Sequence, residues 1–141
     1  MKVARDHERV YFHARTADQL TEHSDAHWMM LFIDADRNHT TGWHGYDYVV
    51  NRRVKDSRTT FLEHTRKGWG WQPKAEVIYL ARGNELMISI LRKDLGIASG
   101  AFQFEFKWAD KIQSENSIKE FTLNGDAAPP GRFNYLYNAP E

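Results

Sequence analysis

Hydrophobic and polar residues alternate with a period of two over much of the chain, which is typical of β-strands with one buried face. The clearest example spans residues 102–108, where four aromatic residues are separated by Gln103, Glu105 and Lys107. By contrast, residues 28–33 are continuously apolar. A short apolar run of this kind predicts a buried strand.

Further strand patterns are separated by polar and glycine-rich connections. They cover residues 3–6, 10–15, 45–53, 58–65, 75–82, 85–91 and 132–137. Gly83 and Asn84 join two of them and predict a two-residue hairpin turn, with glycine at the positive-φ first position. In the 45–53 segment the alternation predicts that Tyr46, Tyr48 and Val50 share one face.

Helical signals are confined to residues 92–96 and residues 16–20, each long enough for one short turn. Regularly spaced strands with turn-rich connections predict an all-β fold, an antiparallel β-sandwich of jelly-roll type. At 141 residues the chain has the length of one domain, so we expect residues 1–141 to share a single core.

The segment that follows the 28–33 strand is rich in oxygen ligands. Asp34, Asp36 and Asn38 occupy alternate positions after the strand, and Asp47 can return on the next one. Ca²⁺ takes six to eight oxygen ligands, and a D-x-D-x-N segment supplies several of them. These residues, with a backbone carbonyl near residue 40, predict a structural calcium site. The alternative is a loop whose carboxylates cap their own backbone amides.

Composition narrows the possible partners. Lys+Arg and Asp+Glu number 19 each, so the formal net charge is zero and no basic stripe favours nucleic acid or a membrane surface. The apolar runs are too short to cross a bilayer. The chain has no cysteine, which excludes disulfides and thiolate metal sites. Since residues 1–6 resemble a strand rather than an apolar leader, either the protein is cytosolic or the chain is a module of a longer protein, and we favour the module.

Several phrases distributed from one end of the chain to the other resemble a known family. They are WMMLFIDAD at 28–36, TGWHGYDY at 41–48, NR at 51–52, GNEL at 83–86, RKDLG at 92–96, FKWAD at 106–110, NGDAAP at 124–129 and GRFNY at 131–135. Together they are similar to carbohydrate-binding module family 9 and the wider DOMON-like domains of bacteria. The resemblance implies a β-sandwich that is part of a longer bacterial protein, secreted, periplasmic or at the cell surface, and concerned with polysaccharides. Arg37 and His39 depart from a simple ion site, because they place cationic groups between the candidate ligands.

Aromatic residues are the natural candidates for contacts with a glycan, since sugar rings stack on exposed indoles. Trp69 and Trp71 flank Gly70, and Trp43 follows the metal segment, so these three form the predicted glycan platform. The alternative is that they cover one end of the sandwich. Other aromatic residues lie in strand patterns and are predicted to be core, namely Trp28, Phe104, Phe106 and Trp108.

Arg52 and Glu105 are predicted to be polar partners of the glycan, because their strands can carry them outward. Known catalytic motifs such as G-x-S-x-G and H-E-x-x-H do not occur in the chain. A glycosidase remains an alternative, since it needs only two carboxylates across a cleft, for instance Glu63 with Glu105.

Two further alternatives involve histidine and methionine. His23 and His27 are four residues apart, a spacing that binds Zn²⁺ on a helix, but no third ligand is evident. Haem would need axial ligands from the set His13, Met29, Met30 and Met87, whose positions fit ordinary core or surface residues. We therefore predict a non-catalytic glycan-binding module with a structural calcium ion. A domain that docks on a neighbouring catalytic domain is the competing interpretation.

Overall fold

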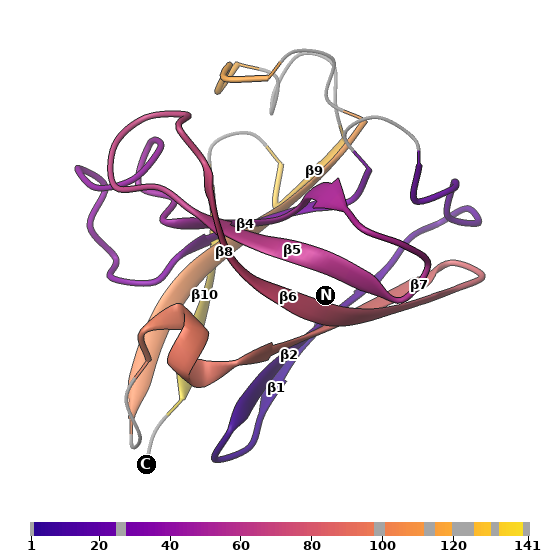
Figure 1. The fold of residues 1–141 in the computed structure, drawn as a ribbon, viewed down its shortest axis with the longest axis horizontal. Helices are drawn as coiled ribbons and strands as arrows, with labels where there is room; N and C mark the ends of the chain where they lie inside the picture. Colours follow the sequence, from indigo (N-terminus) through magenta and orange to yellow (C-terminus); the bar gives the residue numbers. More distant parts are fainter. Residues whose placement is uncertain are drawn as a thin grey trace.

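The computed structural model describes residues 2–24, 28–97, 101–111, 115–119, 126–130 and 133–139. Its regular structure is almost entirely antiparallel β, as predicted (Figure 1). The strands are β1 Lys2–Arg5, β2 Arg9–Arg15, β3 Met30–Asp34, β4 Tyr48–Val54, β5 Thr59–His64, β6 Gln72–Arg82, β7 Glu85–Leu91, β8 Phe102–Asp110, β9 Asp126–Ala128 and β10 Tyr135–Ala139. A short 3-10 helix, η1, spans Arg92–Leu95. None of the described residues forms a helix long and apolar enough to cross a membrane.

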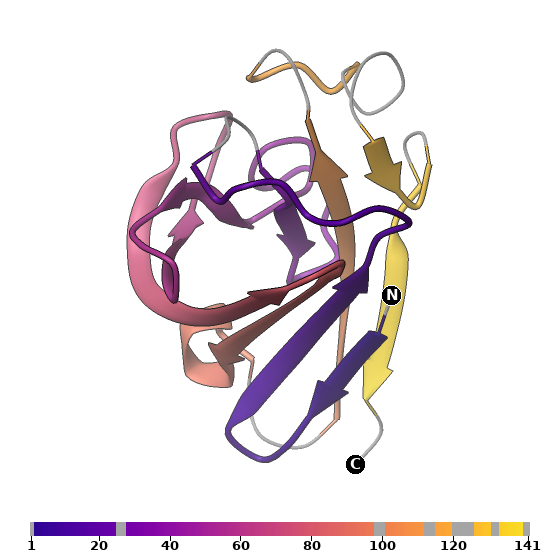
Figure 2. The ribbon, with the colours of Figure 1, turned by 90° about the vertical axis from the view of Figure 1, so that its right-hand side faces the viewer.

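The strands belong to one sheet with the order β1-β2-β7-β6-β5-β4-β3-β8-β10, and β9 pairs with β8 beyond this path. Five consecutive strands, β3 to β7, form a meander of neighbours. The sheet curls strongly, so that its inner face surrounds the core (Figure 2). The sandwich prediction supposed two separate sheets, whereas the hydrogen-bonded path here is continuous.

The main core lies inside the curl. Phe12 of β2 contacts Phe104 and Phe106 of β8, with ring centroids 5.6 and 5.5 Å apart. Five strands separate β2 from β8 along the sheet, so these contacts show that its two ends face each other across the interior. The four aromatic residues predicted to share a face of β8 all point inward. Burial of such large rings stabilises the curl.

A second apolar cluster covers the outer face of the sheet at β3. Leu31 and Ile33 point into the main core, whereas Met30 and Phe32 point outward into this cluster. The remaining buried members are Trp43, Tyr46, Val49, Trp71 and Ala109. Both faces of β3 are therefore buried, which explains why residues 28–33 are continuously apolar.

Turn chemistry was predicted well in the middle of the chain. Gly83 has φ 62° at the first position of the β6–β7 hairpin, as expected. The 92–96 signal corresponds to η1, which ends at Gly96 with φ 68°. Residues 16–20, in contrast, form no helix, so that prediction is wrong. The amides of Thr16 and Leu20 instead bond the carbonyls of Asn84 and Gly83 at the hairpin.

Other sequence predictions need correction. Tyr46 does not share a face with Tyr48 and Val50, because a tight turn at His44 and Gly45 (φ 50° and 95°) places Tyr46 in the outer cluster. The last strand begins at residue 135 rather than 132, and the short β9 was not anticipated. Both differences involve pairing with β8, a long-range contact that local pattern does not reveal.

Candidate metal centre

Three aspartates meet where β3 ends and β4 begins. Asp34 is the last residue of β3, and Asp47 precedes β4. The Asp47 amide donates to the Ile33 carbonyl at 2.8 Å, which closes the intervening loop and brings its ends together. One carboxylate oxygen each from Asp34, Asp36 and Asp47 lies within 4.8 Å of the others. The sequence prediction placed these three residues in one site.

Asp34 is the least satisfied group of the cluster. Its side chain is only 1% exposed, and neither carboxylate oxygen has a hydrogen-bond partner among the described residues. A buried carboxylate without donors is costly, because it has lost its hydration and gained nothing in return. The site therefore requires a proton or a cation at Asp34.

Donors are scarce around the other two carboxylates as well. Asp47 accepts from the amides of Ala35 and Asp36 at 3.0 and 3.4 Å, and Asp36 accepts from the Asn38 amide at 2.9 Å. The Thr41 hydroxyl lies within 3.2 Å of oxygens from both aspartates. It carries one proton and can satisfy only one of them. The cluster thus holds more acceptors than donors.

The shortage of hydrogen-bond donors and the burial of the cluster change the pKa values of its aspartates. Burial raises the pKa of Asp34 to about 7, and contact with Asp36 and repulsion from Asp47 add to the effect. Burial and repulsion from Asp36 raise the pKa of Asp47 to about 6. Burial also acts to raise the pKa of Asp36, but hydrogen bonds from Asn38 and Thr41 outweigh it and lower that pKa overall. Without a cation, the carboxyl groups of Asp34 and Asp47 therefore keep their protons to a higher pH than an ordinary aspartate does.

Asn38 differs from the other predicted ligands. Its side-chain oxygen accepts from the amide and the hydroxyl of Thr40, at 3.0 and 2.6 Å, in the manner of an Asx turn. The Asx-turn alternative therefore holds at Asn38, and also at Asp36, which accepts from the Asn38 amide two residues on, while the three aspartates lie together. Sequence reasoning missed the Thr41 hydroxyl, although its position five residues after Asp36 was the available signal.

His39, Asp34 and Glu105 form a second group whose potential ligand atoms lie within 4.8 Å. Such a mixed nitrogen and oxygen set suits a transition metal. Glu105, however, already pairs with Arg37 at 3.3 Å and accepts from Asn134 at 3.3 Å. Arg37 does not place its charge among the three aspartates, because its guanidinium donates to the side chains of Glu105 and Gln103 on β8.

The oxygen-only group fits a hard cation better. Asp34, Asp36 and Asp47 offer carboxylate oxygens, and the Thr41 hydroxyl adds a neutral one, which is the donor chemistry that Ca²⁺ prefers. Gly45 is necessary for this arrangement. A Cβ at Gly45 would lie 3.1 Å from the His39 Cα and 3.5 Å from an Asp34 oxygen, and φ is 95° there.

The predicted glycan platform lies mostly inside the outer cluster. Trp43 and Trp71 are buried, and Trp69 is half-buried. The Trp69 ring packs edge-on against both, at 4.5 and 5.7 Å between centroids. Stacking needs an exposed ring face, and Trp69 is the least buried of the three, since Trp71 is 6% and Trp43 2% exposed. This arrangement is the covering role that sequence analysis left open.

Arg52 and Glu63 form a close ion pair beside this cluster. Two guanidinium nitrogens donate to the two Glu63 oxygens at 2.8 and 2.7 Å, and Glu115 approaches Arg52 at 3.7 Å. Glu63 is almost fully buried. Glu63 and Glu105 lie on β5 and β8, with β4 and β3 between them. They do not meet as the carboxylate pair of a glycosidase.

The histidine and methionine alternatives gain no geometric support. His27 lies outside the described residues. Met29 and Met30 point to opposite faces of the sheet, since one belongs to the main core and the other to the outer cluster. His13 bonds Glu85 at 3.2 Å and stands opposite the exposed Met87 on β7. These residues occupy ordinary core and surface positions.

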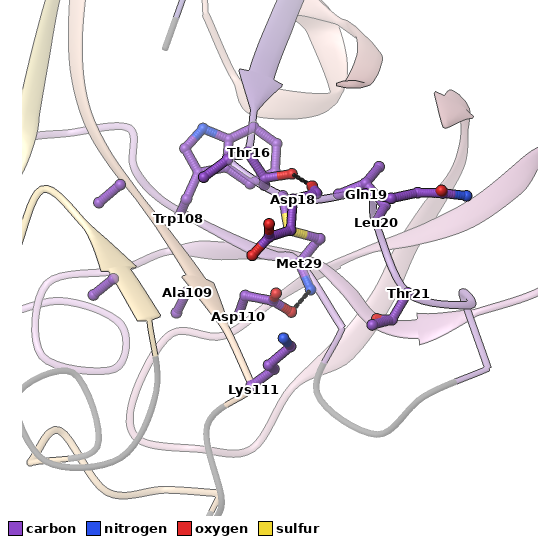
Figure 3. Close-up of a pocket in the computed structure, with 13 residues that line it drawn as sticks. Thr16, Asp18, Gln19, Leu20, Thr21, Met29, Trp108, Ala109, Asp110 and Lys111 are labelled. Atoms are coloured by element: carbon purple, nitrogen blue, oxygen red, sulfur yellow. Dashed lines mark hydrogen bonds between the residues drawn. The ribbon is translucent and has the colours of Figure 1, made fainter. Parts of the chain in front are cut away.

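A small, largely apolar cavity of about 210 Å³ lies elsewhere, between residues 16–21 and the end of β8 (Figure 3). Met29 and Trp108 form part of its wall, and the Met29 amide donates to Asp110 at 3.0 Å. The cavity does not contain the candidate metal ligands. The exposed apolar residues Ile78 and Leu80 lie on β6. The docking hypothesis looked for such residues near Trp69, and it stays a prediction.

Comparisons of the chain with protein-family models, with curated proteins and with solved structures found no match. The resemblance to carbohydrate-binding module family 9 and DOMON-like domains therefore stays a prediction, and the functional argument depends on the geometry of the site.

Proposed function

We propose that this domain binds Ca²⁺ through Asp34, Asp36 and Asp47, and that the ion holds the rim on which the domain recognises a glycan without catalysis. The observation that carries the proposal is Asp34, a buried carboxylate with no donor among the described residues. Asp36 and Asp47 each place a carboxylate oxygen within 4.8 Å of an oxygen of Asp34. A divalent cation would supply the partner that Asp34 lacks and would offset the repulsion among all three carboxylates.

Non-catalytic recognition is supported by how the other carboxylates are engaged. Glu63 is held by Arg52, and Glu105 is held by Arg37. A general acid or base must be able to exchange a proton with a substrate, and a carboxylate that is held in an ion pair is less able to do so. The half-buried Trp69 at the edge of the outer cluster is the aromatic group best placed to contact a sugar.

Calorimetric titration of the metal-stripped protein with Ca²⁺ tests the proposed calcium site. We expect Ca²⁺ to bind with a stoichiometry of one. At a free concentration of 100 times Kd it should stabilise the fold by about 2.7 kcal/mol, equivalent to about 8–10 °C in Tm. An unchanged Tm together with no binding heat would refute the calcium site. A glycan array probed with and without Ca²⁺ tests recognition, and the absence of any calcium-dependent signal would contradict it.

A further inference from the structure

A depression of about 590 Å³ lies directly beside the metal centre and carries charges of both signs. Asp36 and Asp47 contribute to its wall, as do the cationic side chains of Arg66 and Lys74. Both cations are exposed, and within the described part of the chain neither side chain forms a hydrogen bond or an ion pair. Positive groups without partners therefore share one hollow with the candidate ion ligands.

The segment that carries Arg66 is fixed to the metal loop by the backbone. The Thr65 amide donates to the Asp47 carbonyl at 3.0 Å, and the Gly42 amide donates to the Arg66 carbonyl at 3.0 Å. The Gly68 amide then returns to the Gly42 carbonyl at 3.1 Å. These bonds hold the two segments in one arrangement, which lowers the ordering cost of a ligand that touches both.

Lys74 reaches the depression through an irregularity in the sheet. Leu62 pairs with Ala75, but the next residue, Glu63, pairs with Pro73, so Lys74 is the extra residue of a bulge in β6. Bulges redirect side chains and are common beside functional sites. The bulge therefore accounts for a lysine at the wall of the hollow.

The ion determines the sign of the charge in this hollow. Calcium binds the three aspartates in their ionised form, and their three negative charges outweigh the two positive charges of Arg66 and Lys74, so this set of charges is net negative without the ion. Binding of Ca²⁺ adds two positive charges and reverses the sign. A ligand that carries a carboxylate would then be attracted, and its oxygens could occupy coordination positions that the protein leaves open.

We propose that the depression binds an acidic saccharide, with a uronate carboxylate bound to the calcium ion and paired with Arg66 and Lys74. The Tyr48 hydroxyl and the His64 ring, which also line the hollow, are available for sugar hydroxyls. This inference rests on the proposed calcium site, and it names the class of glycan that the domain recognises.

Calorimetric titrations with a galacturonic acid trimer and with its neutral galactose counterpart test the inference. In millimolar Ca²⁺ we expect the acidic trimer to bind about tenfold more tightly than the neutral one, and a chelator should remove this preference. The double variant Arg66→Gln/Lys74→Gln should lose about tenfold in affinity for the acidic trimer and retain its affinity for Ca²⁺. A matched control, Arg58→Gln/Arg82→Gln, removes the same charge at the opposite ends of β5 and β6 and should behave as wild type.

The outcomes separate the two proposals. If Ca²⁺ itself does not bind, both fail. If Ca²⁺ binds but the two trimers bind equally, or the double variant binds the acidic trimer as tightly as wild type, only the acidic-saccharide inference is refuted.

Discussion

Glu63 and Asp34 are both buried carboxylates, each 1% exposed, and both lie on the outer face of the same sheet. Glu63 accepts two short hydrogen bonds from Arg52 on the adjacent strand. Asp34 has no donor among the described residues and instead faces Asp36 and Asp47. The same type of group, equally buried, is thus neutralised by the chain at one position and left unneutralised at the other.

The difference indicates which buried charge belongs to structure and which to a ligand. Removal of a carboxylate from water is compensated only by an opposite charge or by hydrogen bonds. At Glu63 the protein supplies both, so no further partner is needed. At Asp34 the described residues supply neither, so we expect a proton or a metal ion to provide the compensation.

Replacement of Asp34 by asparagine should produce the largest effect on the ion. We expect Asp34→Asn to weaken Ca²⁺ binding by about 100-fold or more, because it removes the most buried charged ligand. The stability of the metal-free protein should not fall, since repulsion with Asp36 and Asp47 is relieved at the same time. Calorimetry and urea denaturation measure the two quantities. The control is Asp56→Asn, at an exposed turn where the carboxylate bonds local amides.

Replacement of Glu63 should have the opposite pattern. Glu63→Gln leaves the Arg52 charge partly buried without its main partner, and we expect a loss of about 2 kcal/mol in the free energy of unfolding. Ca²⁺ affinity should stay at the wild-type value. A urea midpoint equal to wild type would show that Glu115, 3.7 Å from Arg52, is a sufficient substitute.

The pH dependence of the metal-free protein sharpens the comparison further. The pKa values of Asp34 and Asp47 are raised to about 7 and about 6, so the folded state holds protons that the unfolded chain has released. Their contribution to stability is complete below pH 4 and is lost as the pH rises through 6 and 7. Urea titrations at several pH values should show this decline, and Asp34→Asn should reduce it. Calcium should bind more tightly as the pH rises, because the ion competes with these protons.

Two glycines provide the smallest test. Gly45 and Gly83 both have positive φ, but a Cβ would meet His39 and Asp34 only at Gly45. We expect Gly83→Ala to cost about 1 kcal/mol from backbone strain alone and to leave Ca²⁺ binding unchanged. Gly45→Ala should lower the free energy of unfolding by more than this and should also weaken Ca²⁺ binding. Equal effects on both properties would mean that the close approach at Gly45 is unimportant.

Much of the fold followed from local pattern. Strands β7 and β8, the Gly83 turn and the burial of β3 could be predicted from short stretches in which the hydrophobic period and the turn residues agree. The register shift in β6 at Lys74 was not foreseen, nor was the reversal of Tyr46 to the outer face. Both depend on a tight turn or a bulge that offsets the two-residue period by one position.

The candidate site was predicted in part for a similar reason. Asp34 and Asp36 follow a strand closely in sequence, and the next strand had to return nearby, so their meeting with Asp47 was foreseeable. The Asn38 side chain accepts a hydrogen bond from the Thr40 amide. Residue spacing alone does not show whether such a side chain bonds the nearby backbone or a metal ion. Burial of Trp43 and Trp71 was left open because it depends on which residues of the folded sheet, Phe32 among them, lie against these rings.

The sequence by itself determined an all-β chain and a concentration of carboxylates after its most apolar strand, since both are matters of residue type and short spacing. Only the tertiary structure decided that Glu63 forms an ion pair with Arg52, whereas Asp34 has no such partner among the described residues. Charge neutralisation in an interior depends on which strands become neighbours, and in this protein the curl of one continuous sheet sets those neighbours.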